Sequence, residues 1–422
     1  MSRFGIIADD LTGALDTGVQ FSKTGLRTVL QVGARPTSPD GDAADAPVSV
    51  LDTESRDLPP DVAYERVRRA ARRLAGRVVY KKIDSTLRGN VGRELDAVMD
   101  ALGLERALVA PAFPANGRTT VGGRVMVHGQ PLLETSFAAD PLCPATDNVP
   151  ALLAGQSARR VGHVALDVVE RGAGALRAEI ARRAEPLLVV DALSDAHLRA
   201  IAAAAAQMGT PGTPPPCLTC GSAGLAQALP AAFGVESREA PFPGDRARRR
   251  HGAGPVLVVA GSRHPATLRQ IEAAVSRVGA ALVGLDPLNG EAALALASGE
   301  ASERLRAGEY VVVTTALAPY LPGRGHEIAA GLGRLAVDVL SRASPAGLVL
   351  TGGSVAFAAC RALDVAAIEL RAEVAPGVPS GVLLGGPWQG MRVVTKAGGF
   401  GSDDAILRAI EYLGGILENG NS

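Results

Sequence analysis

One ten-residue stretch, KKIDSTLRGN at 81–90, carries an unusual density of polar side chains directly after an apolar run. Two lysines, an aspartate, two hydroxyls and an arginine stand within eight residues. Arginine pairs bidentately with carboxylate, and lysine supplies a point charge. Acidic and hydroxyl side chains can form hydrogen bonds with sugar hydroxyls. The stretch predicts a site for a small anionic, hydroxylated ligand. A solvated turn capped by Ser or Thr is the weaker alternative, because the charges are mixed and dense.

Other predicted strands also end in polar or glycine-rich segments. In open α/β sheets, ligands gather at the carboxyl ends of strands, near helix N-termini. In the N-terminal half this rule selects acids, hydroxyls and cations: Asp9, Asp10, Thr12, Lys82, Asp84, Ser85, Thr86, Arg88, Gly89, Asn116 and Arg118. An acid after a strand can also serve only as a helix N-cap. The adjacent pair at 9–10, followed by Thr-Gly, favours a functional use of one of the two.

The C-terminal half offers mostly glycine and hydroxyl groups at the same kind of position. Glycine lets backbone N–H groups approach closely, and such groups at a helix start bind phosphate. The selected residues are Ser262, Thr351, Gly352, Gly353, Ser354, Gly398 and Gly399. One half therefore resembles a site for a polyhydroxy acid, and the other a site for a nucleotide.

The elements that position these residues alternate between short apolar strands and helices, which predicts two α/β domains with mostly parallel sheets. A stretch rich in Pro, Gly and charge predicts a linker at 236–253, between an N-terminal domain at 1–235 and a C-terminal domain at 254–422. The segment 114–148 breaks the alternation with hairpin-like pieces, and we expect an arm that covers the ligand.

Composition excludes several classes of protein. The 422 residues carry equal numbers of acidic and basic side chains, so nothing predicts a general affinity for nucleic acid or membrane. No signal peptide or membrane-spanning run is recognisable, which predicts a cytoplasmic protein. The CLTC sequence at 217–220 lacks a second Cys pair, so we expect apolar strand residues there rather than a metal site. The histidines have no metal-ligand spacing, and we predict no protein-bound metal.

Familiar nucleotide signatures are absent, because the sequence has neither a GxxxxGK[ST] loop nor a GxGxxG fingerprint after a strand. In combination, however, eight segments resemble the four-carbon acid sugar kinase family over essentially the whole chain. They are IIADDLTGALDTG, YKKIDSTLRGNVG, APAFPANGRTTVGG, DPLCPATD, GSAGLA, GLVLTGG, VAPGVPSG and TKAGGFGSDD. The resemblance implies a sugar-acid-binding N-terminal domain, an ATP-binding C-terminal domain and an active site in the cleft between them.

The implied reaction is ATP-dependent phosphorylation of the terminal hydroxyl of a four-carbon sugar acid, with Mg²⁺ on the ATP. The opening stretch resembles the branch acting on D-threonate or D-erythronate more than the 3-oxo-tetronate kinases. Arg88 and Lys82 would hold the carboxylate or the transferring phosphoryl group, and Asp10 or Asp84 would accept the hydroxyl proton. The remaining residues of the N-terminal set would bind the acid. A homodimer is compatible with the sequence.

One departure from the family pattern lies beside the Gly pair of the nucleotide site. Many relatives carry an acid and a threonine there, whereas this chain has Ser354 and Val355. We expect both to line the ATP site and a weakened or altered contact to the nucleotide. The departure leaves open a sensor that binds a sugar acid without turnover. A dehydrogenase or aldolase acting on the same acids is a further alternative, without a dinucleotide fingerprint or metal-binding histidines to support it.

Overall fold

The computed structural model describes residues 3–34, 45–140, 142–210, 214–236, 253–286, 289–319 and 323–415. Residue contacts divide the chain into two compact units, Met1–Thr28 with Ala44–Arg238, and Val29–Ala43 with Glu239–Ser422. The predicted domain limits stay a prediction, and residues 237–252 of the predicted linker lie outside the described part of the chain.

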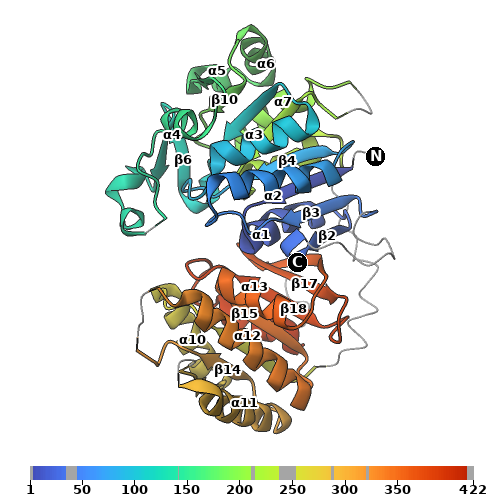
Figure 1. The fold of residues 1–422 in the computed structure, drawn as a ribbon, viewed down its shortest axis with the longest axis vertical. Coiled ribbons are helices and arrows are strands. Elements are labelled where there is room, and N and C mark those ends of the chain that lie inside the picture. The colour runs from blue at the N-terminus through green and yellow to red at the C-terminus, as the bar shows by residue number, and fades with distance from the viewer. Residues whose placement is uncertain are drawn as a thin grey trace. The chain divides into compact units, whose positions relative to one another are not determined.

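The first unit, drawn mostly in blue to green in Figure 1, is built on a parallel sheet. The strand order is β3-β1-β4-β11-β5-β10-β9. Its strands are β1 (Phe4–Ala8), β3 (Val48–Asp52), β4 (Val78–Lys82), β5 (Arg106–Ala110), β9 (Val161–Val164), β10 (Leu187–Val190) and β11 (Cys217–Gly221). Most are short apolar runs buried along their whole length, as expected of strands covered on both faces. The predicted α/β class is confirmed.

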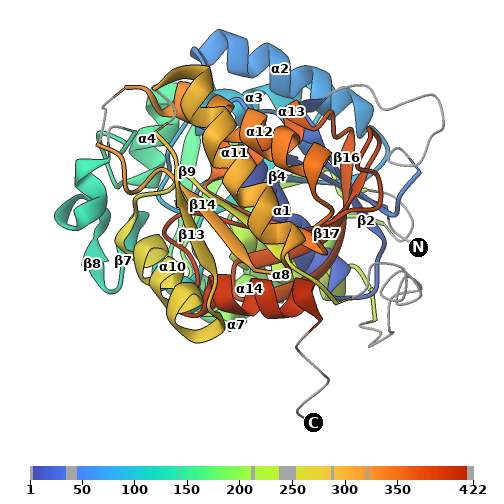
Figure 2. The same ribbon diagram turned by 90° about the horizontal axis from the view of Figure 1, so that it is seen from below.

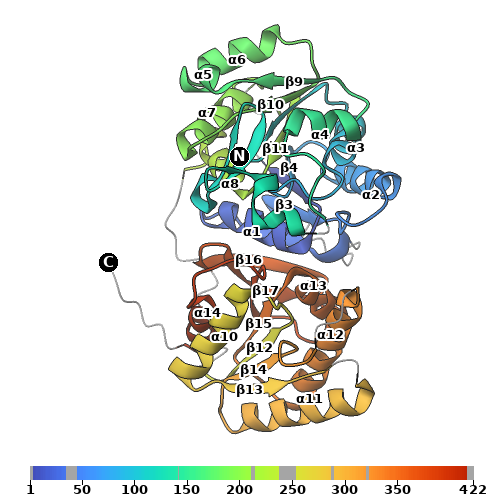
Figure 3. The ribbon, with the colours of Figure 1, turned by 90° about the vertical axis from the view of Figure 1, so that its left-hand side faces the viewer.

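Helices cover both faces of this sheet. They are α1 (Leu11–Ser22), α2 (Pro60–Arg73), α3 (Val91–Leu102), α4 (Val149–Gln156), α5 (Leu166–Glu170), α6 (Ala173–Arg182), α7 (Asp195–Ala206) and α8 (Ala223–Ala232). Figure 3 shows α2, α3 and α4 on one face, and α1, α8 and α7 on the other. The strand β2 (Thr28–Gln31) and a short turn, η1 (Val32–Ala34), follow α1.

The excursion at 114–148 folds as a small antiparallel sheet with short helical turns, visible at the margin of its unit in Figure 2. It contains β6 (Arg118–Val121), β7 (Arg124–Val127) and β8 (Gln130–Pro131), with η2 (Pro114–Asn116), η3 (Leu132–Glu134) and η4 (Ser136–Ala139). The β6–β7 turn has positive φ at Gly122 and Gly123, and their N–H groups donate to Asp191 at 2.8 and 2.9 Å. The predicted hairpin is confirmed.

The second unit has a sheet in the order β13-β14-β12-β15-β18-β17-β16. Its parallel strands are β12 (Val256–Ala260), β13 (Ala281–Gly284), β14 (Val311–Thr314), β15 (Gly347–Thr351) and β18 (Arg392–Lys396). The sheet ends in an antiparallel pair, β16 (Ala367–Ala375) and β17 (Val378–Leu384), which the sequence pattern did not predict.

The helices of the second unit also lie on two faces. They are α10 (Pro265–Val278), α11 (Gly290–Arg306), α12 (Gly325–Arg342), α13 (Gly353–Ala362) and α14 (Ala405–Gly414). Figure 2 shows α10 beside α14 on one face, with α11, α12 and α13 in a row on the other. Within the described ranges, no helix combines the length and the apolar character needed to cross a membrane.

The two cysteines of CLTC are buried strand residues of β11, as predicted. Both are free thiols. Burial raises the pKa of Cys217 and of Cys220 to about 12, so neither is a reactive thiolate near neutral pH.

Candidate functional site

The carboxyl ends of β1, β3 and β4 meet at one edge of the first unit, because β1 pairs with both of the other strands in parallel. Asp9 and Asp10 follow β1, and the loop after β3 contributes Glu54 and Arg56. Lys82 ends β4 and leads into Asp84 and Arg88. The topology thus brings most of the predicted ligand-binding residues of the N-terminal half to one edge.

Arg56 is the centre of the first group of contacts. Its guanidinium binds Asp9 through two hydrogen bonds, of 2.8 and 3.1 Å, and donates a third of 2.7 Å to Asp10. Burial alone would raise the pKa of Asp9, but Arg56 and the nearby lysines hold that pKa below its usual value. Asp10 also caps α1 by accepting from the Gly13 N–H at 2.8 Å. The predicted capping role is confirmed for Asp10, and a functional use of either acid stays a prediction.

A second group of contacts forms around Arg88. Its guanidinium binds Asp84 bidentately, at 2.8 and 3.1 Å, and also reaches Asp140 at 3.1 Å. Burial disfavours the Asp84 charge, yet Arg88, Arg56 and a hydrogen bond from Thr86 hold the pKa of Asp84 far below its usual range. A carboxylate held in this way is a weak base.

Arg118 of the excursion interacts electrostatically with this second group. Its guanidinium stacks over Phe137 at 4.9 Å and donates to the backbone oxygen of Asn116. Its buried Nε has no hydrogen-bond partner among the described residues. A buried donor without a partner is costly unless a ligand satisfies it.

Lys82 offers a charge that the protein does not neutralise by direct contact. Its side chain is almost wholly buried, and its Nζ forms no hydrogen bond or ion pair with any described residue. A Cβ on Gly13 would lie only 2.8 Å from Nζ, so the ammonium lies against the first turn of α1. The preceding Lys81, by contrast, is paired with the buried Glu94 at 2.7 Å. Lys81 supports the fold, whereas Lys82 can serve a ligand.

Glu54 is a strained, half-buried acid in the same group. Its φ of 44° is in the left-handed region, which is unusual for a residue other than glycine. Its Oε1 accepts from the Leu11 N–H at 3.0 Å, at the start of α1. Burial, followed by repulsion from Asp10, raises the pKa of Glu54 to about 7.

The sequence analysis missed Glu54 and Arg56. Both lie in DTESR at 52–56, directly after β3. The rule that selected the ends of β1 and β4 applies equally to β3, so a usable signal was present. The smaller predicted residues lie where expected. Thr12 is in the first turn of α1, and Ser85, Thr86 and Gly89 lie in the loop between β4 and α3.

In the second unit, the neighbouring strands β12, β15 and β18 each end in a small-residue turn. A Cβ on Gly398 would lie 2.3 Å from Ser262 Oγ, and one on Gly399 would lie 3.2 Å from His264 Nε2. Gly352 lies beside the same serine, with a φ of 101° that favours glycine. It precedes α13, whose N-cap makes no side-chain hydrogen bond. These turns form a cradle of exposed backbone suited to phosphate.

Lys396, the last residue of β18, supplies the charge beneath this cradle. Its Nζ donates to the Gly398 oxygen at 3.1 Å and to the hydroxyls of Thr267 and Thr351, at 3.3 and 3.4 Å. It forms no ion pair with any acid in the described ranges. Burial lowers the pKa of Lys396 to about 8. The sequence analysis selected Thr351 but not Lys396.

The two residues that depart from the family pattern lie in different surroundings. Ser354 is exposed at the start of α13. Val355 is buried, and a Cβ on Gly261 would come within 2.5 Å of its Cγ2. The side chain of Val355 therefore packs against the turn after β12. Its contact with a nucleotide stays a prediction.

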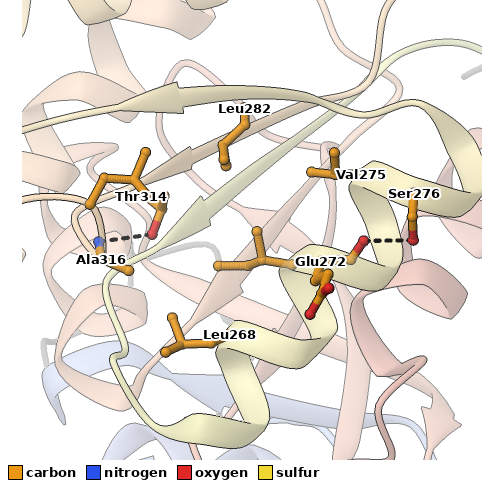
Figure 4. Close-up of a pocket in the computed structure, with 9 residues that line it drawn as sticks. Leu268, Glu272, Val275, Ser276, Leu282, Thr314 and Ala316 are labelled. Atoms are coloured by element: carbon orange, nitrogen blue, oxygen red, sulfur yellow. Dashed lines mark hydrogen bonds between the residues drawn. The ribbon is translucent and has the colours of Figure 1, made fainter.

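An apolar pocket of about 340 Å³ lies between α10, β13 and the end of β14 (Figure 4). Its walls include Leu268, Val275, Leu282 and Leu317, each with more than a third of its surface exposed. Glu272 supplies a carboxylate at the wall. The pocket is joined to the cradle through the loop after β14, since Arg263 donates to the Thr315 oxygen at 2.8 Å.

Two family models match successive parts of the chain. Residues 4–229 match the model of a sugar-binding N-terminal domain, and residues 257–406 match that of a nucleotide-binding C-terminal domain. A D-threonate kinase of Salmonella typhimurium is 36% identical, and one of Bordetella bronchiseptica is 39% identical, each over 97% of both chains. A D-erythronate kinase of Heliobacterium modesticaldum is 32% identical over 98% of this chain and 97% of its own.

Solved structures share the fold. A Haemophilus influenzae protein of the DUF1537 family matches with a TM-score of 0.74 and 25% identity, over 98% of this chain and 99% of its own. A Salmonella typhimurium structure matches with a TM-score of 0.78 and 23% identity, over 97% of this chain and 99% of its own.

Proposed function

Because the chain belongs to the four-carbon acid sugar kinase family, we propose that it transfers the γ-phosphoryl group of ATP to the terminal hydroxyl of D-threonate or D-erythronate. The observation that carries this proposal is the buried, unpaired ammonium of Lys82 within a group of acids and arginines. Such a group binds a small molecule that is both anionic and rich in hydroxyls.

Within the first unit, Lys82 and Arg118 provide the cationic groups with unused donors. They would bind the substrate carboxylate or the phosphoryl group in transfer. Asp10 and Arg56 would orient the substrate hydroxyls, because they form one connected network at the start of α1. Arg88 is engaged by Asp84 and Asp140, so it would act mainly by adding positive charge to the site. Phosphoryl transfer depends on such positioning and charge more than on covalent chemistry.

Within the second unit, the Gly352, Gly398 and Gly399 turns would bind the ATP phosphates through their backbone. Two features of these turns suit the binding of ATP phosphates. A side chain at Gly398 would fill the space next to Ser262, and Lys396 supplies a cation with no acid bound to it. Mg²⁺ would arrive as MgATP and remain on the phosphate oxygens.

The apolar pocket between α10 and β13 is the proposed site of the adenine ring. Its aliphatic side chains offer apolar contact to a planar ring, and Glu272 can accept a hydrogen bond from the exocyclic amine. Guanine presents a carbonyl oxygen at that position, which the carboxylate would repel. A Leu268→Asp change should therefore weaken ATP binding without altering sugar-acid binding, as measured by calorimetry for each ligand.

An ADP-release assay with MgATP tests the function directly. The panel contains D-threonate, L-threonate, D-erythronate, L-erythronate, 3-oxo-tetronates and acids of other chain lengths. Strong turnover on D-threonate or D-erythronate supports the proposal. Strong turnover on a 3-oxo-tetronate would change the proposed substrate but would still support an ATP-dependent kinase. Sugar-acid binding without ADP release would indicate a sensor instead. A cytoplasmic location and a homodimer stay predictions.

A further inference from the structure

We propose that Glu54 accepts the proton of the reacting hydroxyl, and that ionisation of Glu54 sets the acidic limit of activity. The proposal rests on the kinase function proposed above. In the transfer, the hydroxyl oxygen forms a bond to the γ-phosphorus, and the bond from that phosphorus to the β–γ bridging oxygen breaks. ADP leaves with that electron pair. The hydroxyl proton passes to the Glu54 carboxylate and then to water.

Apart from Asp52, which accepts from the Glu54 N–H, the main acids near this edge are bound to cations. Arg56 binds Asp9 and Asp10, Arg88 binds Asp84 and Asp140, and Lys81 binds Glu94. A carboxylate in an ion pair holds protons weakly, so these acids are poor proton acceptors at neutral pH. Glu54 forms no ion pair with any residue that the structure describes. This difference separates Glu54 from Asp10 and Asp84, the two acids that the sequence favoured.

The backbone of Glu54 is held in its unfavourable conformation by specific contacts. The Arg66 guanidinium donates to the carbonyl oxygens of Thr53 and Glu54 at 3.2 and 3.0 Å, and Asp52 accepts from the Glu54 N–H at 3.0 Å. These contacts direct the carboxylate to the start of α1, where its Oε1 meets the Leu11 N–H. A strained residue fixed in this way at a ligand site suggests a function for its side chain.

The charged groups around Glu54 come from three segments. Asp10 precedes α1, Asp52 ends β3, and Arg56 lies in the same loop as Glu54. Burial and Asp10 raise the pKa of Glu54 to about 7, although the Leu11 hydrogen bond, Asp52 and Arg56 act in the opposite direction. A general base works best when its pKa lies near the operating pH.

Glu54→Gln is the decisive variant, because glutamine keeps an oxygen for the Leu11 N–H but cannot take up the proton. We expect kcat to fall about 100-fold, the usual scale for a lost general base. The acidic limb of the wild-type pH profile, centred near pH 7, should disappear, and the KM for the sugar acid should stay within about threefold. Glu54→Asp should retain part of the activity and shift the limb to lower pH. A Glu54→Gln enzyme that retains the wild-type kcat and limb would overturn the proposal.

Glu65→Gln is the matched control, since Glu65 is an exposed acid of α2 that pairs with Arg68 at 2.9 Å. Its kcat and pH profile should match those of wild type. Absence of wild-type turnover on the whole panel would count against the kinase function itself. Turnover by wild type together with an unchanged Glu54→Gln profile would count only against the role of Glu54.

A stability measurement tests the ionisation of Glu54 without any substrate. The folded pKa lies above the unfolded value, so charging Glu54 destabilises the fold progressively as pH rises from about 4.5 to 7. The Tm of Glu54→Gln should therefore rise relative to wild type between pH 5 and pH 8. If the Tm of Glu54→Gln and the Tm of wild type depended on pH in the same way, Glu54 would have an ordinary pKa. That result would overturn the proposal even if Glu54→Gln were inactive.

Discussion

Replacing Lys82 by methionine should reduce activity and leave stability intact. The side chain is 5% exposed and its ammonium has no partner in the described structure, so a bound carboxylate or phosphoryl oxygen would supply its first direct ion pair. Removing one member of a buried charge pair costs about 2–5 kcal/mol in binding. Taking about 3 kcal/mol, kcat/KM should fall by roughly 150-fold.

The same change should not destabilise the free enzyme. The Lys82 ammonium has no direct counter-ion, and only its longer-range attraction to Asp9 offsets the lost hydration, whereas methionine fills a similar volume without that cost. We therefore expect the free energy of unfolding of Lys82→Met, measured by urea denaturation, to equal or exceed that of wild type. Lys81→Met should behave in the opposite way, because it leaves Glu94 buried without its partner.

Steady-state kinetics with the sugar acid varied, at saturating MgATP, provide the assay. Lys23→Met serves as the control, because Lys23 is an exposed lysine at the end of α1. Two results would refute the reasoning. One is a kcat/KM for Lys82→Met within threefold of wild type. The other is a loss of stability as large as the loss of activity, which would make Lys82 a structural residue.

Three further predictions concern the nucleotide site and the cysteines. Gly398→Ala should raise the KM for ATP at least about tenfold, because its Cβ would clash with Ser262. Unchanged ATP kinetics would contradict the proposal that these glycine turns bind the ATP phosphates. Lys396 should lose its charge as pH rises through about 8, so the Kd for ATP from calorimetry should increase between pH 7 and 9 in wild type. Lys396→Met should remove that dependence, and a dependence that persists would contradict the assignment. Native protein should resist iodoacetamide at Cys217 and Cys220 at pH 8, since burial holds both thiols protonated; rapid labelling of either, seen by mass spectrometry, would be inconsistent with this burial.

The sequence predicted the parallel strands well because each is a short apolar run that ends at a turn. It did not predict β16 and β17, whose burial is mixed along their length. Strands of that kind depend on partners distant in sequence, since β17 pairs with β18 as well as with β16. Periodicity within a single segment cannot reveal such pairing.

The sequence predicted where the candidate site lies better than it predicted which of its residues contact one another. The rule of strand ends located Asp9, Asp10 and Lys82, but it could not show that Arg56 would bind two of these acids. That arrangement depends on β3 lying beside β1. The backbone of Glu54 is held in its strained conformation by contacts with Arg66 and Asp52, and its pKa is raised by burial and by Asp10. Most of these causes depend on the folded arrangement, for which the sequence carries no local signal.

Phosphorus NMR of the reaction product tests the central claim most directly. Purified protein is incubated with MgATP and the best acid of the panel, and the proton-coupled spectrum is recorded. Transfer to the terminal hydroxyl predicts ADP together with a phosphate ester whose signal is split by the two protons of a CH₂ group. A signal split by a single proton, or inorganic phosphate as the only new species, would contradict phosphorylation at the terminal hydroxyl.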